Sequence, residues 1–141
     1  MSALFIDTSG WAAFLIRSDP FHEAATLLLQ EHRKRGRSVL TTNYVMAELV
    51  ALLTSPIRLS RPEQVRIIAT LRSASWVHIV HIDPSQDKAS WDLLAASNDD
   101  KTWSLVDCAS FVVMRDRCIA AALTNDRHFE QAGFIRLLKH C

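Results

Sequence analysis

Short, uninterrupted apolar runs alternate with longer amphipathic segments along this 141-residue chain. Helices are predicted where apolar side chains share one helical face, as Trp11, Phe14 and Leu15 do. Strands are predicted where apolar residues follow one another without a break, as in Ala3–Ile6. The predicted helices span residues 8–17, 21–35, 43–54, 61–72, 85–96, 105–115 and 127–132, and the predicted strands span residues 3–6, 38–41, 76–82, 119–123 and 134–138.

The order of these segments predicts the fold class. Strands that are separated by helices pair in parallel through crossover connections. Continuous apolar strands fit a sheet that is covered on both faces. We therefore expect an α/β fold, a three-layer α/β/α sandwich around a central parallel sheet. No repeat, linker or low-complexity stretch divides the chain, so residues 1–141 are expected to form a single domain.

Composition narrows the class of protein. The chain is 49% hydrophobic and 22% charged, as is usual for a globular protein. No apolar run approaches the roughly 20 residues that a membrane-spanning helix needs, and no signal peptide is evident. The three cysteines, Cys108, Cys118 and Cys141, show no metal-binding spacing and are interpreted as incidental thiols in a reducing compartment. These features predict a cytoplasmic protein that does not enter a membrane.

The net charge of +1 gives no indication of a nucleic-acid partner, because phosphate binding usually requires a basic surface. The densest basic segment, Arg33–Arg37, lies at the end of a predicted helix. Positive charge suits that position because of the helix dipole, so we interpret this segment as a solvated helix end.

Four carboxylates lie in apolar surroundings. Asp7 and Asp126 each follow a predicted strand, whereas Glu48 and Asp107 interrupt predicted apolar helices. An ionised carboxylate in such a setting is costly unless it is paired, hydrogen-bonded or bound to a cation. Ligands of open parallel sheets bind beyond the carboxyl ends of the strands, where the strand order reverses. The four carboxylates therefore predict a shared metal site at that edge.

Each carboxylate also has a structural interpretation. Asp7 can cap the first helix, Asp107 can interact with a helix dipole, and Asp126 can belong to a turn. Glu48 is the hardest to explain in this way, because its neighbours are apolar and a structural role would require a buried partner. Glu48 is therefore the strongest single indication of a cation site.

Several segments resemble a known family. Phe5–Ser9, the helix that carries Glu48, Ser104–Cys108 and Leu123–Phe129 are similar, in the same order, to the PIN domain of VapC-type toxins. The similarity extends over essentially the whole chain. It implies a PIN-like fold and an Mg²⁺- or Mn²⁺-dependent endoribonuclease, the toxin of a type II toxin–antitoxin pair.

The resemblance also implies roles for the carboxylates. Asp7, Asp107 and Asp126 are expected to bind the metal, directly or through water, and Glu48 to bind it or to position the attacking water. All four are therefore candidate catalytic residues. Carboxylate oxygens are hard ligands that suit Mg²⁺ and Mn²⁺.

Neighbouring polar residues are candidates for orienting these ligands. Ser104 and Asn125 lie beside ligands in the sequence, and Thr8 is a weaker candidate. His128 lies two residues after Asp126 at the start of a helix, and we interpret it as structural rather than catalytic.

The resemblance implies an RNA substrate, a cognate antitoxin and a homodimer. The helices over residues 45–53 and 61–72 are a candidate groove for the antitoxin. Three other functions stay open: a housekeeping PIN nuclease for RNA processing or decay, an Asp-based phosphatase and a non-catalytic RNA-binding module. The phosphatase normally needs a second Asp two residues after the first, where this chain has Ser9. The presence of all four carboxylates argues against the binding module.

Overall fold

The computed structural model describes residues 3–140, so Cys141 lies outside the described part of the chain. Every predicted helix and strand is present, and its ends differ from the prediction by at most two residues. The elements in chain order are β1 (Leu4–Ile6), α1 (Thr8–Leu15), α2 (His22–Lys34), β2 (Val39–Thr42), α3 (Asn43–Thr54), α4 (Arg61–Ser73), β3 (Val77–Val80), α5 (Pro84–Ala96), α6 (Leu105–Asp116), β4 (Ala121–Leu123), α7 (Arg127–Gln131) and β5 (Ile135–Arg136).

The strands form one parallel sheet in the order β3-β2-β1-β4-β5. The chain moves outward from β1 to β2 and β3, and then returns to place β4 on the other side of β1. The strand order therefore reverses between β1 and β4. Ile6 pairs with Leu123, so the two strands end level with each other. This register brings Asp7 close to the residues that follow β4.

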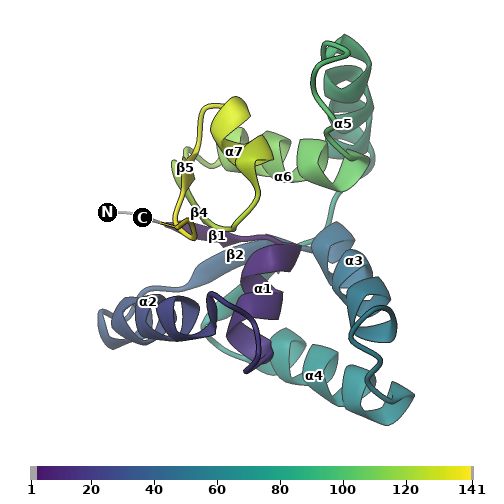
Figure 1. Cartoon of the computed structure of the whole chain (residues 1–141). Coiled ribbons are helices and arrows are strands. Elements are labelled where there is room, and N and C mark those ends of the chain that lie inside the picture. The colour runs from purple at the N-terminus through teal and green to yellow at the C-terminus, as the bar shows by residue number, and fades with distance from the viewer. Residues whose placement is uncertain (1–2, 141) are drawn as a thin grey trace.

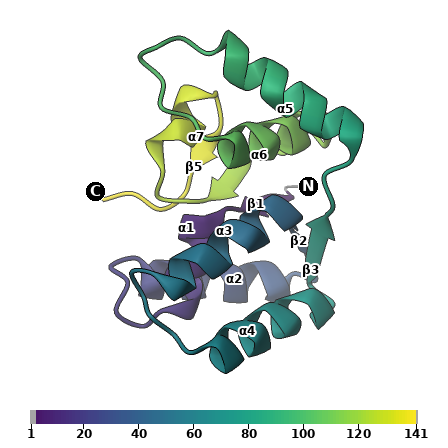
Figure 2. The same cartoon turned by 90° about the vertical axis from the view of Figure 1, so that its right-hand side faces the viewer.

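Helices cover both faces of the sheet (Figures 1 and 2). α5, α6 and α7 lie on one face, and α1, α2 and α4 lie on the other. α3 packs against α1 and α4 and also reaches α6. Right-handed crossovers explain this division, because connections that run in opposite directions along a sheet cover opposite faces. The predicted α/β/α sandwich is confirmed.

The core lies between the sheet and these helices. All residues of β1 and β2 are buried, which fits the expected sheet that is covered on both faces. Trp11 of α1 is fully buried, and its indole N–H donates a hydrogen bond to Thr41 Oγ1 of β2 at 3.1 Å. Phe111 of α6 packs edge-on against Phe129 of α7. Within residues 3–140, no helix is both long and apolar enough to cross a membrane.

Gly10 lets α1 approach the end of β4. A Cβ atom at Gly10 would lie 2.0 Å from the carbonyl oxygen of Leu123, a distance that real structures do not show. The backbone N–H of Gly10 donates to Asp7 Oδ1 at 2.9 Å. The missing side chain therefore sets the distance between the start of α1 and the residues after β4.

Candidate metal centre

A cleft of about 400 Å³ lies next to the point where the strand order reverses. All four predicted carboxylates, Asp7, Glu48, Asp107 and Asp126, line this cleft. They come from four separate parts of the chain, and only the sheet topology brings them together. The predicted clustering is therefore present in the structure.

Asp7 is the most buried of the four, with a side chain held by three hydrogen bonds. Its Oδ1 accepts from Ser9 Oγ at 2.8 Å and from the Gly10 N–H at 2.9 Å, and its Oδ2 accepts from Thr124 Oγ1 at 2.7 Å. Burial raises the pKa of Asp7 from 3.8 to about 7, although these hydrogen bonds act in the opposite direction. The carboxylate is thus a helix cap whose negative charge is only partly compensated.

Ser9 and Thr124 belong to this arrangement, and the sequence interpretation missed them as functional residues. Ser9 Oγ also accepts the N–H of Asn125, and Thr124 Oγ1 accepts the N–H of Asp126, both at 3.0 Å. The two hydroxyls therefore connect Asp7 to the segment that carries the next carboxylate. The signal in the sequence was a hydroxyl residue close behind each of the two central strands.

Asp107 lies in the first turn of α6 and forms a capping box with Ser104. Asp107 Oδ2 accepts the N–H of Ser104 at 3.0 Å, and Ser104 Oγ accepts the N–H of Asp107 at 3.0 Å. Burial is the main cause that raises the pKa of Asp107, and the negative charge of Asp126 raises it further. Ser104 thus contacts the side chain that it was predicted to orient.

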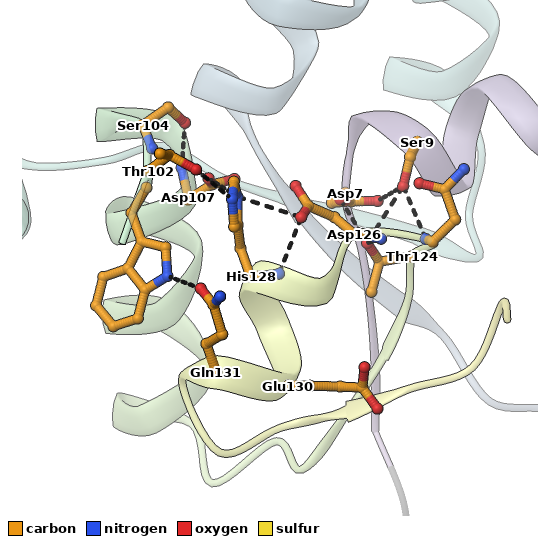
Figure 3. A network of polar contacts seen from close by, with 12 residues as sticks. Asp7, Ser9, Thr102, Ser104, Asp107, Thr124, Asp126, His128, Glu130 and Gln131 are labelled. Carbon is orange, nitrogen blue, oxygen red and sulfur yellow. Dashed lines mark hydrogen bonds and ion pairs between the residues drawn. The ribbon is translucent and has the colours of Figure 1, made fainter. Parts of the chain in front are cut away.

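Asp126 caps α7 and faces Asp107 across a histidine ring (Figure 3). His128 Nδ1 lies 3.0 Å from Asp107 Oδ2 and 3.2 Å from Asp126 Oδ1. His128 Nε2 lies 2.9 Å from Thr102 Oγ1. The sequence interpretation gave His128 a structural role, whereas the structure places its ring between two candidate metal ligands. Its position two residues after Asp126 was the available signal.

Glu48 reaches the cleft from α3, and its Oε1 accepts a hydrogen bond from Thr8 Oγ1. This contact agrees with the predicted orienting role of Thr8. Glu48 is only half-buried, whereas Asp7 is 7% exposed. Asp7, and not Glu48, is therefore the more buried carboxylate, and a bound cation would offset the cost of burying its charge.

Asn125 also lines the cleft. Its backbone N–H donates to Ser9 Oγ, and its carbonyl oxygen accepts from Arg136 Nη1 at 3.0 Å. These backbone contacts hold the segment after β4 in place. The predicted role of the Asn125 side chain in orienting ligands stays a prediction.

The donor set fits a divalent cation. Asp107, Asp126 and His128 each present one ligand atom, and these atoms lie within 4.8 Å of one another. Asp7 and Glu48 line the same cleft and add further carboxylate oxygens. Oxygen ligands of this kind suit Mg²⁺ and Mn²⁺.

Comparison with known proteins identifies the family. The PIN domain model matches residues 4–135. The chain belongs to the PIN domain family. Two curated relatives, the 23S rRNA-specific endonuclease VapC20 of Mycobacterium tuberculosis strains CDC 1551 and H37Rv, are each 31% identical over 134 residues. The alignment covers 95% of this chain and 97% of each relative.

Two solved structures agree with this result. The crystal structure of M. tuberculosis VapC20, described as a Sarcin-Ricin loop cleaving toxin, matches with a TM-score of 0.81 at 30% identity and covers 94% of this chain and 96% of that chain. FitAcB from Neisseria gonorrhoeae matches with a TM-score of 0.66 at 15% identity over 94% of both chains, which shows the shared fold. The predicted VapC-type PIN fold is confirmed.

Proposed function

We propose that this protein is a divalent-metal-dependent endoribonuclease and the toxin of a type II toxin–antitoxin pair, which acts in the cytoplasm on RNA. One observation carries the proposal. Four carboxylates line a single cleft in a PIN chain that is 31% identical, over nearly its whole length, to a 23S rRNA-specific endonuclease.

The residues of the cleft would have different roles in the reaction. Asp7, Asp107 and Asp126 would hold the metal, and Glu48, which Thr8 orients, would hold the metal or the attacking water. When bound, Mg²⁺ or Mn²⁺ supplies a Lewis acid that activates water and stabilises charge on phosphate oxygens. In-line attack would leave a 5′-phosphate and a 3′-hydroxyl.

The direct test uses purified protein and two RNA substrates. Bacterial 23S rRNA and an oligonucleotide of the sarcin–ricin loop are the first candidates, because the VapC20 relative is described as cleaving that loop. We expect cleavage with Mg²⁺ or Mn²⁺ and none in excess EDTA. Activity that persists in EDTA, or an absence of cleavage of any RNA with either metal, would contradict the proposal.

The geometry disfavours the phosphatase alternative. Such a phosphatase needs a second acid two residues after its nucleophilic aspartate. In this structure the Asp7 carboxylate accepts hydrogen bonds from Ser9, Gly10 and Thr124. The position of the second acid is held by Ser9, which donates one of these bonds. Incubation with a phosphoryl donor is therefore expected to leave no aspartyl-phosphate on Asp7.

A toxin and a housekeeping nuclease differ in their effect on growth. Induced expression of a toxin should arrest growth, and co-expression of the small protein encoded next to its gene should relieve the arrest. Expression of the Asp107→Asn variant at the same level is the matched control. Growth that continues at high levels of active enzyme would favour the housekeeping function.

The antitoxin would bind at two places. A groove of about 380 Å³ between α3, α4 and β3 is lined by Met46, Val50, Ile68 and Arg72, among others, and supports docking on the predicted helices. A basic segment of the antitoxin would then reach the carboxylate cleft. A homodimer is part of the same proposal, and light scattering on the purified protein would measure its mass.

A further inference from the structure

We propose that His128 is a nitrogen ligand of the metal in the carboxylate cleft and that it gives the site a preference for transition-metal ions such as Mn²⁺ over Mg²⁺. The inference rests on the proposed metal-dependent function and adds a ligand and a metal preference to it. Its starting point is the position of the imidazole Nδ1 atom, 3.0 Å and 3.2 Å from two candidate carboxylate ligands.

The ring is held in this position from several directions. The backbone N–H of His128 donates to Asp126 Oδ1 at 2.9 Å, and Nε2 contacts Thr102 Oγ1 at 2.9 Å. The next residue of α7, Phe129, is fully buried, which anchors the helix in the core. A ligand with so little freedom loses little conformational entropy when it binds a metal.

Thr102 can form a hydrogen bond with His128 both in the metal-free and in the metal-bound site. Without metal, Nδ1–H can donate to Asp107 Oδ2, and Nε2 can then accept from the hydroxyl of Thr102. If Nδ1 binds a metal, its proton moves to Nε2, which then donates to Thr102 Oγ1. A hydroxyl serves as donor or acceptor, so both tautomers keep this bond. Metal-binding histidines usually have such a partner at the second ring nitrogen.

Trp103 keeps this partner in place. Its indole N–H donates to Gln131 Oε1 of α7 at 3.0 Å, and its ring packs edge-on against Phe111 at 5.1 Å between centroids. The segment before α6 is therefore connected to α7 by two successive side chains, Thr102 and Trp103. These contacts position Thr102 beside the histidine.

An imidazole ligand changes which metal the site prefers. Mg²⁺ binds oxygen ligands and water in nearly ideal octahedral geometry and gains little from nitrogen. Mn²⁺ also favours oxygen ligands, but as a first-row transition-metal ion it accepts an imidazole nitrogen more readily than Mg²⁺ does. A site in which one imidazole joins the carboxylates should therefore bind Mn²⁺ more tightly than a site of carboxylates alone, with little change for Mg²⁺.

Pulsed electron paramagnetic resonance of the Mn²⁺-loaded protein tests the ligand directly, because a bound imidazole gives a ¹⁴N coupling to the manganese. We expect this coupling in the unmodified protein and its loss in His128→Asn. Asparagine retains an N–H that can donate to the carboxylates. His78→Asn, at an exposed position of β3, is the matched control and should keep the coupling.

Calorimetric titration measures the preference. We expect His128→Asn to weaken Mn²⁺ binding by about tenfold or more, with a change for Mg²⁺ of less than about threefold. Thr102→Val should weaken Mn²⁺ binding by a smaller factor in the same direction. Equal losses for both metals in His128→Asn would overturn the preference.

The outcomes separate this inference from the proposed function. Mn²⁺ that binds the unmodified protein but not Asp107→Asn, and that shows no ¹⁴N coupling, would overturn the role of His128 and leave the proposed function standing. A coupling that survives in His128→Asn would overturn the assignment in the same way. A failure of the unmodified protein to bind Mn²⁺ or Mg²⁺ would overturn the proposed function itself.

Discussion

The carboxylates at the two ends of the cleft are stabilised in different ways. At one end, Asp7 is buried, and Ser9, Gly10 and Thr124 hold both of its oxygens. At the other end, Asp107 and Asp126 are half-buried and share one histidine. The first end belongs to the core, whereas the second is built from the starts of two helices on one face of the sheet.

Because of this difference, substitutions at the two ends of the cleft should affect stability and activity to different extents. A substitution at the Asp7 end disturbs the contact between α1 and β4 as well as the metal site. A substitution at the Asp107 end changes the metal site with little effect on the core, because α6 keeps the rest of its cap. Substitutions at the Asp107 end therefore test catalysis. Substitutions at the Asp7 end test how much the buried carboxylate lowers the stability of the fold.

The largest effect is expected from Asp107→Asn. Loss of this carboxylate should lower RNA cleavage by about 100- to 1000-fold, because the metal loses a charged ligand. Asn still accepts the N–H of Ser104 through its Oδ1, so the free energy of unfolding in EDTA should change by less than about 1 kcal/mol. Cleavage assays and urea denaturation measure the two quantities.

Asp92→Asn provides the matched control for this variant. Asp92 forms an exposed ion pair with Lys88 on α5, and its loss should leave both activity and stability nearly unchanged. Undiminished cleavage by a folded Asp107→Asn protein would contradict the assignment of Asp107 as a ligand.

Gly10→Ala should destabilise the fold by about 2 to 3 kcal/mol, because the new methyl group would overlap the carbonyl of Leu123 and force α1 away from β4. Gly36→Ala is the comparison. Gly36 has a φ of +69° with open space around it, so that change should cost about 1 kcal/mol. Urea denaturation measures both, and equal losses would refute the close approach at Gly10.

Asp7 should make the stability of the metal-free protein depend on pH. Its folded pKa, about 7, lies above the ordinary value of 3.8, so the folded state retains a proton that the unfolded state has released. The contribution of Asp7 to stability should therefore be greatest below pH 4, fall as the pH rises to 7 and then level off. Asp7→Asn should remove this component and stabilise the protein at pH 8 by on the order of 2 kcal/mol.

Urea denaturation of both proteins in EDTA at pH 5 and pH 8 measures this difference. The comparison between the two proteins isolates Asp7 from the other titrating groups. A stability difference between them that is the same at both pH values would show that burial does not raise the pKa of Asp7. Saturating Mn²⁺ should stabilise the unmodified protein more than the variant at pH 8.

The smallest effect is expected from Thr8→Val, which removes the hydroxyl that donates to Glu48. Cleavage should slow by about five- to tenfold, because one hydrogen bond that orients the glutamate is lost. Thr70→Val on α4 removes a hydroxyl that bonds only within its own helix and serves as the control. Identical cleavage rates for the unmodified protein, Thr8→Val and Thr70→Val would show that Thr8 does not contribute to catalysis.

Local patterns in the sequence were sufficient for most elements and for the four carboxylates. Helical spacing and unbroken apolar runs depend on neighbouring residues, so the positions of helices and strands followed from them. The relative burial of the carboxylates could not be predicted from these local patterns. Glu48 has the more apolar neighbours in the sequence, but Asp7 is the more buried, because burial depends on which elements pack around a residue.

The sequence by itself determined the α/β class, the family resemblance and the identity of the four carboxylates, because each of these is written in local spacing and in short motifs. Only the tertiary structure decided which polar groups from distant parts of the chain hold them. Thr124 meets Ser9 and Asp7, and His128 meets Asp107, across 115, 117 and 21 positions of the chain. Such contacts arise from the parallel pairing of β1 with β4 and from the packing of α7 beside α6, which no local pattern encodes.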